Sequence, residues 1–160
     1  AAYAENDQTA MVSPRASSSK APITRGRKLQ QLLKNNKNLV EIRDEAVVFT
    51  VTYGAGKSDF HVPREMKSAL LEAAKASQNI EIRGYTDADV DSQAEQEIAL
   101  ARAISAYDFL VQNGIAANQI YVTYESSGSF FGDNSTPKGR ARNRRVELEM
   151  TGGEMSMFFE

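Results

Sequence analysis

The sequence of 160 residues contains no cysteine and no tryptophan, and it has one histidine. Without cysteine there can be no disulfide framework, no thiol nucleophile and no thiolate metal site. His61 has neither a cysteine nor a second histidine with which to share a metal, so we expect no metal centre and no cofactor. No apolar run approaches the length of about 18 residues that suggests a membrane-spanning helix.

The chain also lacks an excess of positive charge, since its formal net charge is −2 and its pI is near 5.6. Such a chain has no overall basic field to attract nucleic acid or an anionic membrane. The hydrophobic content of 41% in 160 residues allows one domain with a real core and is too short for two of ordinary size.

Composition divides the chain into four parts. Residues 1–24 are rich in Ala, Ser, Asn and Gln and are predicted to form a linker or disordered arm. Residues 25–45 are predicted to form a short helix, over 27–33, and a strand extension. Residues 46–150 are the expected folded domain, and residues 151–160 are an apolar tail that either packs, stays disordered or docks a partner. The opening Ala1-Ala2-Tyr3-Ala4 is compatible with a secretory signal or lipid anchor removed upstream.

Hydrophobic patterns predict strands and two helices within this domain. Segments 39–42 and 46–53 are predicted strands around a polar turn, and the segments 79–84, 120–125 and 145–150 alternate like half-buried strands. One helix follows Pro63, and the second carries an apolar stripe that we expect to face the core: Leu100, Ala103, Ile104, Tyr107, Leu110 and Val111. This order predicts an α+β two-layer sandwich with both helices on one face of a mixed sheet.

Three separated blocks carry a family resemblance. They are Gly84-Tyr85-Thr86-Asp87, then Ala101-Arg102-Ala103, then the stretch from Asn134 through Arg140 and Asn143-Arg144-Arg145 to Leu148. In this order the chain resembles the OmpA-like domains of outer-membrane porin tails, peptidoglycan-associated lipoproteins and flagellar stator subunits. The resemblance covers about two-thirds of the chain and implies a β-α-β-α-β-β domain over residues 46–150, without catalytic activity.

The resemblance implies that Asp87 and Arg102 hold the amino and carboxylate groups of diaminopimelate in peptidoglycan. The residue types suit this chemistry, because a carboxylate accepts hydrogen bonds from an ammonium and a planar guanidinium binds a carboxylate through two parallel bonds. Arg102 follows Leu100 by two residues, roughly 200° around the helix, so we expect it to lie off the core face and to point freely at a ligand.

Four more residues are expected at this site. Thr86 precedes the aspartate, and Asn143 and Arg144 support the loop. Thr136-Pro137 is a competent helix start, which would place Arg140 and Arg144 near the same end of the sheet. Glu95 stands where the family commonly has an asparagine, two helical turns before Arg102. At about 5 Å and an effective dielectric near 20, it would repel a ligand carboxylate by roughly 3 kcal/mol.

Other motifs are weaker. Asp87, Asp89 and Asp91 begin like a calcium loop, but Ser92 replaces the required glycine. The segment 54–58, Gly-Ala-Gly-Lys-Ser, is reminiscent of a phosphate loop, but it lacks the upstream glycine, and Pro63 delays the helix. The arginines between 140 and 145 are interpreted as bracing the ligand pocket and not as a nucleic-acid patch. No nucleophile paired with a base is evident, so an enzyme is not expected.

Two hypotheses therefore stand. The first is a periplasmic, outer-membrane-tethered protein that anchors an envelope protein or complex to the cell wall, with its membrane anchor outside this chain. The second is an OmpA-like scaffold with a degraded pocket, a structural component of an envelope-spanning secretion or motility complex that binds other subunits of that complex. Glu95 favours the second hypothesis.

Overall fold

The computed structural model describes residues 31, 34 and 39–155. Five strands form one mixed sheet in the order β1-β2-β5-β3-β4, in which β3 and β4 are parallel and the other neighbours are antiparallel. The strands are β1 (Val40–Arg43), β2 (Ala46–Thr52), β3 (Asn79–Tyr85), β4 (Ile120–Glu125) and β5 (Arg145–Thr151). All five predicted strands are confirmed. The predicted helix over 27–33 lies almost wholly outside the described residues.

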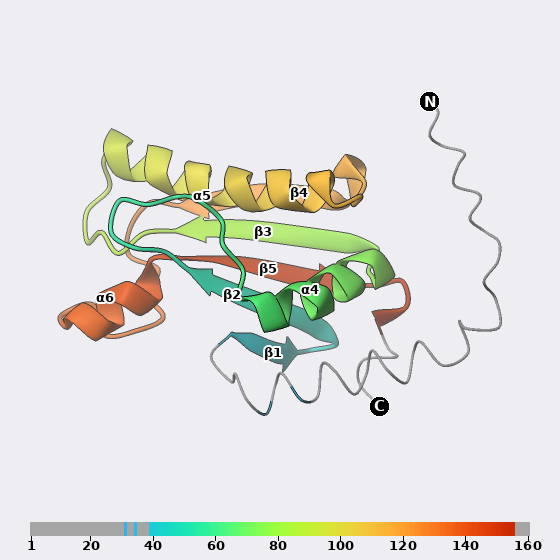
Figure 1. The fold of residues 1–160 in the computed structure, drawn as a ribbon. Coiled ribbons are helices and arrows are strands. Elements are labelled where there is room, and N and C mark those ends of the chain that lie inside the picture. The colour runs from blue at the N-terminus through green and yellow to red at the C-terminus, as the bar shows by residue number, and fades with distance from the viewer. Residues whose placement is uncertain (1–30, 32–33, 35–38, 156–160) are drawn as a thin grey trace, which may run out of the picture.

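Two helices, α4 (Arg64–Ala76) and α5 (Gln93–Gln112), contribute to one core with the strand side chains beneath them. Figure 1 shows both helices against the sheet, α5 over β3 and β4 and α4 towards the β2 side. The predicted α+β sandwich is confirmed. Within the described residues, no helix combines the length and apolarity needed to cross a membrane.

The predicted core face of α5 is partly wrong. Leu100, Ile104 and Val111 are 37%, 43% and 38% exposed, whereas the buried stripe consists of Ala99, Arg102, Ala103, Ala106 and Leu110. The reason is a close approach of the helix to β3: a Cβ added at Gly84 would lie 2.0 Å from the carbonyl oxygen of Ala99. Only small side chains fit such a contact, so alanines and not the larger apolar residues line the interface.

The opposite face of the sheet carries paired charges. Arg83 contacts Glu149 at 2.9 Å and Glu147 at 3.3 Å, and Arg145 contacts Glu147 at 2.8 Å. The Arg145 guanidinium also lies over the Tyr85 ring, 3.8 Å from its centroid. Arg145 therefore stabilises the sheet, and the basic stretch is not uniformly available to a ligand.

The carboxyl ends of β2, β3 and β4 meet at one end of the sheet, beside the short helix α6 (Pro137–Asn143) (Figure 1). Helix α6 starts as predicted, with the Thr136 hydroxyl accepting a hydrogen bond from the Gly139 N–H at 3.0 Å and Pro137 in the first turn. This end of the sheet brings together segments that are far apart in the sequence.

Candidate ligand-binding site

Arg102 enters the site from α5, and its side chain is buried, with 1% exposure. Its Nε donates to the carbonyl of Lys57 at 2.8 Å, its Nη1 to the carbonyl of Tyr85 at 2.8 Å, and its Nη2 to the carbonyl of Gly54 at 3.4 Å. The expectation that Arg102 lies off the core face and is free is therefore wrong. The helix rotates its alanine face onto the sheet, and Arg102 turns inward with that face.

The buried guanidinium has no ion-pair partner among the described carboxylates. Burial is the main reason that its pKa lies below the ordinary value, and the more distant charges of Asp87 and Glu95 oppose that shift while Arg144 adds to it. Carbonyl dipoles satisfy the N–H groups but leave the net charge uncompensated. The site therefore holds a positive charge that an anionic group would stabilise.

Tyr53 covers this guanidinium. The Arg102 guanidinium carbon lies 5.1 Å from the centroid of the Tyr53 ring, and the Tyr53 hydroxyl donates to the Arg102 carbonyl at 3.3 Å. Burial, the largest cause, raises the pKa of the Tyr53 hydroxyl to about 12. The phenol therefore remains neutral at physiological pH and interacts with the cation through its ring.

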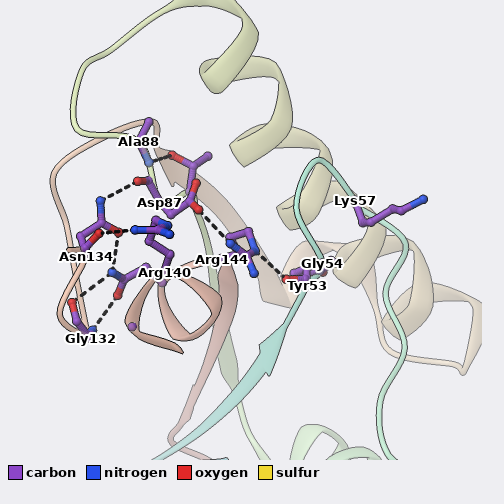
Figure 2. A network of polar contacts seen from close by, with 12 residues as sticks. Tyr53, Gly54, Lys57, Asp87, Ala88, Gly132, Asn134, Arg140 and Arg144 are labelled. Carbon is purple, nitrogen blue, oxygen red and sulfur yellow. Dashed lines mark hydrogen bonds and ion pairs between the residues drawn. The ribbon is translucent and has the colours of Figure 1, made fainter. Parts of the chain in front are cut away.

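Asp87 follows β3 and is partly exposed, and its Oδ2 accepts a hydrogen bond from Arg144 Nη1 at 2.9 Å. Arg144 also donates from Nε to the carbonyl of Tyr53 at 3.1 Å, so it bridges the exits of β2 and β3 (Figure 2). The pair is incompletely buried, with side-chain exposures of 16% for Arg144 and 27% for Asp87. Asp87 can accept a further donor on the oxygen that Arg144 does not bind.

Asn143 and Thr86 organise the loops around this pair. Asn143 is fully buried; its Oδ1 accepts from the N–H groups of Phe131 and Gly132 at 2.7 and 2.6 Å, and its Nδ2 donates to Asn134 Oδ1 at 2.9 Å. The Thr86 hydroxyl donates to the carbonyl of Ser126 at 2.7 Å, which ties the exit of β3 to that of β4. Both side chains are fully engaged in loop contacts.

Asn134 is a member of the network that the sequence reasoning missed. Its Nδ2 donates to the carbonyl of Asp87 at 2.8 Å, and its main-chain carbonyl accepts from Arg140 Nη1 at 3.2 Å (Figure 2). The same Nδ2 donates to Asp89 Oδ1 at 3.1 Å. Tyr53 and the carbonyls of Gly54 and Lys57 were missed as well. Their roles come from long-range contacts, for which an individual residue type gives no signal.

Glu95 lies in the first turn of α5, whose N-cap Ser92 accepts a hydrogen bond from the Glu95 N–H at 3.1 Å. The carboxylate is partly buried and forms no hydrogen bond or ion pair within the described residues, although its charge acts on Arg102. Among all the residues that the structure describes, no three or more His, Asp or Glu side chains lie together so that they could hold a metal ion. Charge interactions within the site link Arg102 and Arg144 with the carboxylates of Asp87 and Glu95.

Comparisons with known proteins identify the family of the chain. The model of the OmpA family matches residues 52–144, which is more than half of the chain. A type IV secretion system putative outer membrane lipoprotein of Brucella suis is 29% identical over 72 residues, or 45% of this chain and 42% of that protein. The peptidoglycan-binding protein ArfA of Mycobacterium tuberculosis is 36% identical over 69 residues, or 43% of this chain and 21% of that protein.

Among solved structures, the cell wall anchor of the T6SS from Pseudomonas aeruginosa superposes with a TM-score of 0.60 at 22% identity, covering 79% of this chain and 96% of that one. This likeness shows the fold. The alignments span less than half of the two curated relatives.

Fold, site position and family match together define a small α+β domain with a polar cluster at one end of its sheet. The chain belongs to the OmpA family. This is a family of structural domains and not a class of enzymes.

Proposed function

We propose that this domain binds peptidoglycan through the diaminopimelate residue of its stem peptide. Asp87 accepts the ligand ammonium on its free oxygen, and Arg102 and Arg144 together stabilise the ligand carboxylate. The observation that carries the proposal is the buried, unpaired guanidinium of Arg102 beside the partly exposed Asp87. A zwitterion would supply both of the charges that this arrangement can accept.

Contact between the ligand and Arg102 requires a small rearrangement. The hydrogen bond from Arg102 Nη2 to the Gly54 carbonyl is long, at 3.4 Å, and is the one that a ligand carboxylate would replace. Arg144 is more accessible, and its Nη2 makes no described hydrogen bond. Thr86, Asn143 and Asn134 act indirectly by fixing the loops that carry Asp87.

Known relatives support the same function. ArfA is named as a peptidoglycan-binding protein, and the T6SS structure is described as a cell wall anchor. We infer that the chain works in the periplasm and that a membrane anchor outside this sequence tethers it to the outer membrane, as the name of the Brucella suis lipoprotein suggests. Its task is then to hold an envelope protein or complex against the wall.

A second function, as a scaffold within an envelope-spanning secretion complex, is favoured by two observations. The Brucella relatives are named as type IV secretion system lipoproteins, and Glu95 places a negative charge close to the proposed carboxylate site. In that case the Asp87–Arg144 ion pair would be a structural contact at a domain interface.

Retention on purified sacculi tests the first function. Wild-type protein should be retained, whereas Asp87→Ala should reduce the affinity by about tenfold or more, because it removes a charge-assisted hydrogen bond to the ligand. Arg102→Lys keeps the charge but loses the planar fork, and it should also weaken retention. The matched control is Asp108→Ala, which removes an exposed carboxylate of α5 that lies six residues after Arg102.

The scaffold alternative gives a different pattern. Wild-type protein would then not be retained on sacculi, or all four proteins would be retained equally. A gain of retention in Glu95→Asn alone would indicate a pocket that this glutamate has disabled.

A further inference from the structure

The turn between β2 and α4 directs two main-chain carbonyl oxygens at Arg102. Residues 54–57 form a tight turn, closed by a hydrogen bond from the Lys57 N–H to the Gly54 carbonyl at 3.0 Å, with Gly56 at φ +69°. The same Gly54 carbonyl and the Lys57 carbonyl accept hydrogen bonds from Arg102 at 3.4 and 2.8 Å. The Lys57 side chain points away from Asp87 and Arg144 (Figure 2), so this residue contributes its carbonyl and not its charge.

The glycine-rich segment 54–58 is reminiscent of a phosphate loop in sequence, but it directs the opposite kind of main-chain group at the site. A phosphate loop presents N–H groups to an anion. Here the carbonyls of Gly54 and Lys57 are directed at a guanidinium, so the turn stabilises a cation that belongs to the protein itself.

Tyr53, which precedes the turn, contacts both arginines of the site. Its ring covers the Arg102 guanidinium, with 5.1 Å between the ring centroid and the guanidinium carbon. Its main chain is bonded twice to Arg144: the Tyr53 N–H donates to the Arg144 carbonyl at 2.8 Å, and Arg144 Nε donates to the Tyr53 carbonyl at 3.1 Å. A shift of this segment would therefore move both guanidinium groups relative to Asp87.

We propose that residues 53–57 are a positioning element that fixes the guanidinium of Arg102 and thereby sets the affinity of the site for a ligand carboxylate. The part that concerns affinity rests on the proposed function. Binding geometry of this kind requires that each group be held to within about 0.5 Å. Arg102 has no carboxylate partner among the described residues, so its position depends on main-chain carbonyls and on the Tyr53 ring. The Tyr85 carbonyl of β3 holds Nη1, and the turn holds Nε and Nη2.

The test compares two substitutions with two matched controls. Gly56→Val places a β-branched residue at φ +69°, whereas Gly114→Val makes the same change at φ +94° at the end of α5; in neither position would an added Cβ meet an atom within 4 Å. Tyr53→Leu removes the ring, whereas Tyr53→Phe keeps it and loses only the hydroxyl contacts. Circular dichroism and thermal unfolding establish that each variant folds.

Two measurements are made on each protein. The exchange of the Arg102 Nε–H with water, followed by NMR without ligand, reports on the bond to the Lys57 carbonyl. Calorimetric titration with a diaminopimelate-containing muropeptide reports on the affinity.

We expect exchange to accelerate at least about tenfold, and affinity to fall about tenfold, in Gly56→Val and Tyr53→Leu, as loss of a charge-assisted contact implies. Tyr53→Phe and Gly114→Val should stay within about threefold of the wild type in both measurements. If the exchange in Gly56→Val and Tyr53→Leu matches that of the controls, the positioning role is wrong. If wild-type protein binds no muropeptide while the exchange pattern holds, the proposed function fails and the positioning of Arg102 stands.

Discussion

Replacement of Asn143 by alanine should destabilise the domain strongly. The side chain is fully buried and takes part in four hydrogen bonds, two from the N–H groups of Phe131 and Gly132 and two to Gly132 and Asn134. Leaving a buried donor without a partner costs about 1–3 kcal/mol. For the two N–H groups alone, the loss of unfolding free energy would be roughly 2–6 kcal/mol. Because the loop is partly exposed and water can replace part of these bonds, we expect a loss of about 3 kcal/mol.

Urea unfolding at neutral pH measures this loss of unfolding free energy. In thermal unfolding of a domain of this size, we expect the midpoint temperature to fall by roughly 10 °C. The control is Asn113→Ala, since the Asn113 side chain makes one described hydrogen bond, to the Phe109 carbonyl at 2.8 Å, and its loss should cost about 1 kcal/mol. Ligand affinity should also fall, because the loop carries Asn134, which holds the carbonyl of Asp87. If Asn143→Ala is no more destabilising than Asn113→Ala, the loop does not depend on this network.

Three further outcomes are expected. Glu95→Gln should tighten muropeptide binding by roughly three- to tenfold in calorimetry, because it removes a partly solvent-screened negative charge near the ligand carboxylate; an unchanged affinity would show that this charge is not felt by the ligand. Burial raises the pKa of Tyr53 from 10.0 to about 12, so the neutral phenol contributes about 2–3 kcal/mol to the free energy of unfolding. This contribution is fully present below pH 10 and is lost as the pH rises towards 12. Unfolding free energies at pH 9 and 11.5 should therefore fall less in Tyr53→Phe than in the wild type, and parallel declines would contradict this assignment. Gly84→Ala should cost about 3 kcal/mol or more in urea unfolding, since its Cβ would lie 2.0 Å from the Ala99 carbonyl oxygen; wild-type stability would mean that α5 can move away at little cost.

The strands and the class of fold could be predicted because alternation with period two is a local property. Ile80 and Ile82 of β3 are buried while Glu81 between them is exposed, as the sequence pattern indicates. The hairpin turn was also predictable, because polar residues separate two apolar segments there. Asp44 and Glu45 form this turn with positive φ angles of 52° and 64°. Such features depend on a few neighbouring residues and not on tertiary contacts.

The buried face of α5 could not be read correctly from hydrophobicity alone. Leu100 and Ile104 gave the stronger apolar signal, but the close approach at Gly84 selects Ala99 and Ala103 for the interface. A glycine in a strand followed by alanines at helical spacing was the available clue. The same error placed Arg102 outside the core.

The sequence predicted which residues lie together at this end of the sheet but not which partners each of them contacts. Asp87, Arg102, Thr86, Asn143 and Arg144 do lie at the same end of the sheet, and Glu95 is close enough to act electrostatically on Arg102. The pairing of Asp87 with Arg144, and of Arg102 with main-chain carbonyls, joins segments up to 57 residues apart. Those partners follow from the three-dimensional path of the chain. The ligand-binding roles of all six residues remain predictions.

The central claim is that one zwitterionic group is bound between Asp87 and the two arginines. Calorimetry with two muropeptides that differ only in diaminopimelate or lysine at the third position tests it, because lysine keeps the side-chain ammonium and lacks the side-chain carboxylate. We predict that the diaminopimelate peptide binds at least about tenfold more tightly and that Asp87→Ala lowers its affinity by about tenfold or more. Equal affinities for the two peptides, or undiminished binding by Asp87→Ala, would contradict the account.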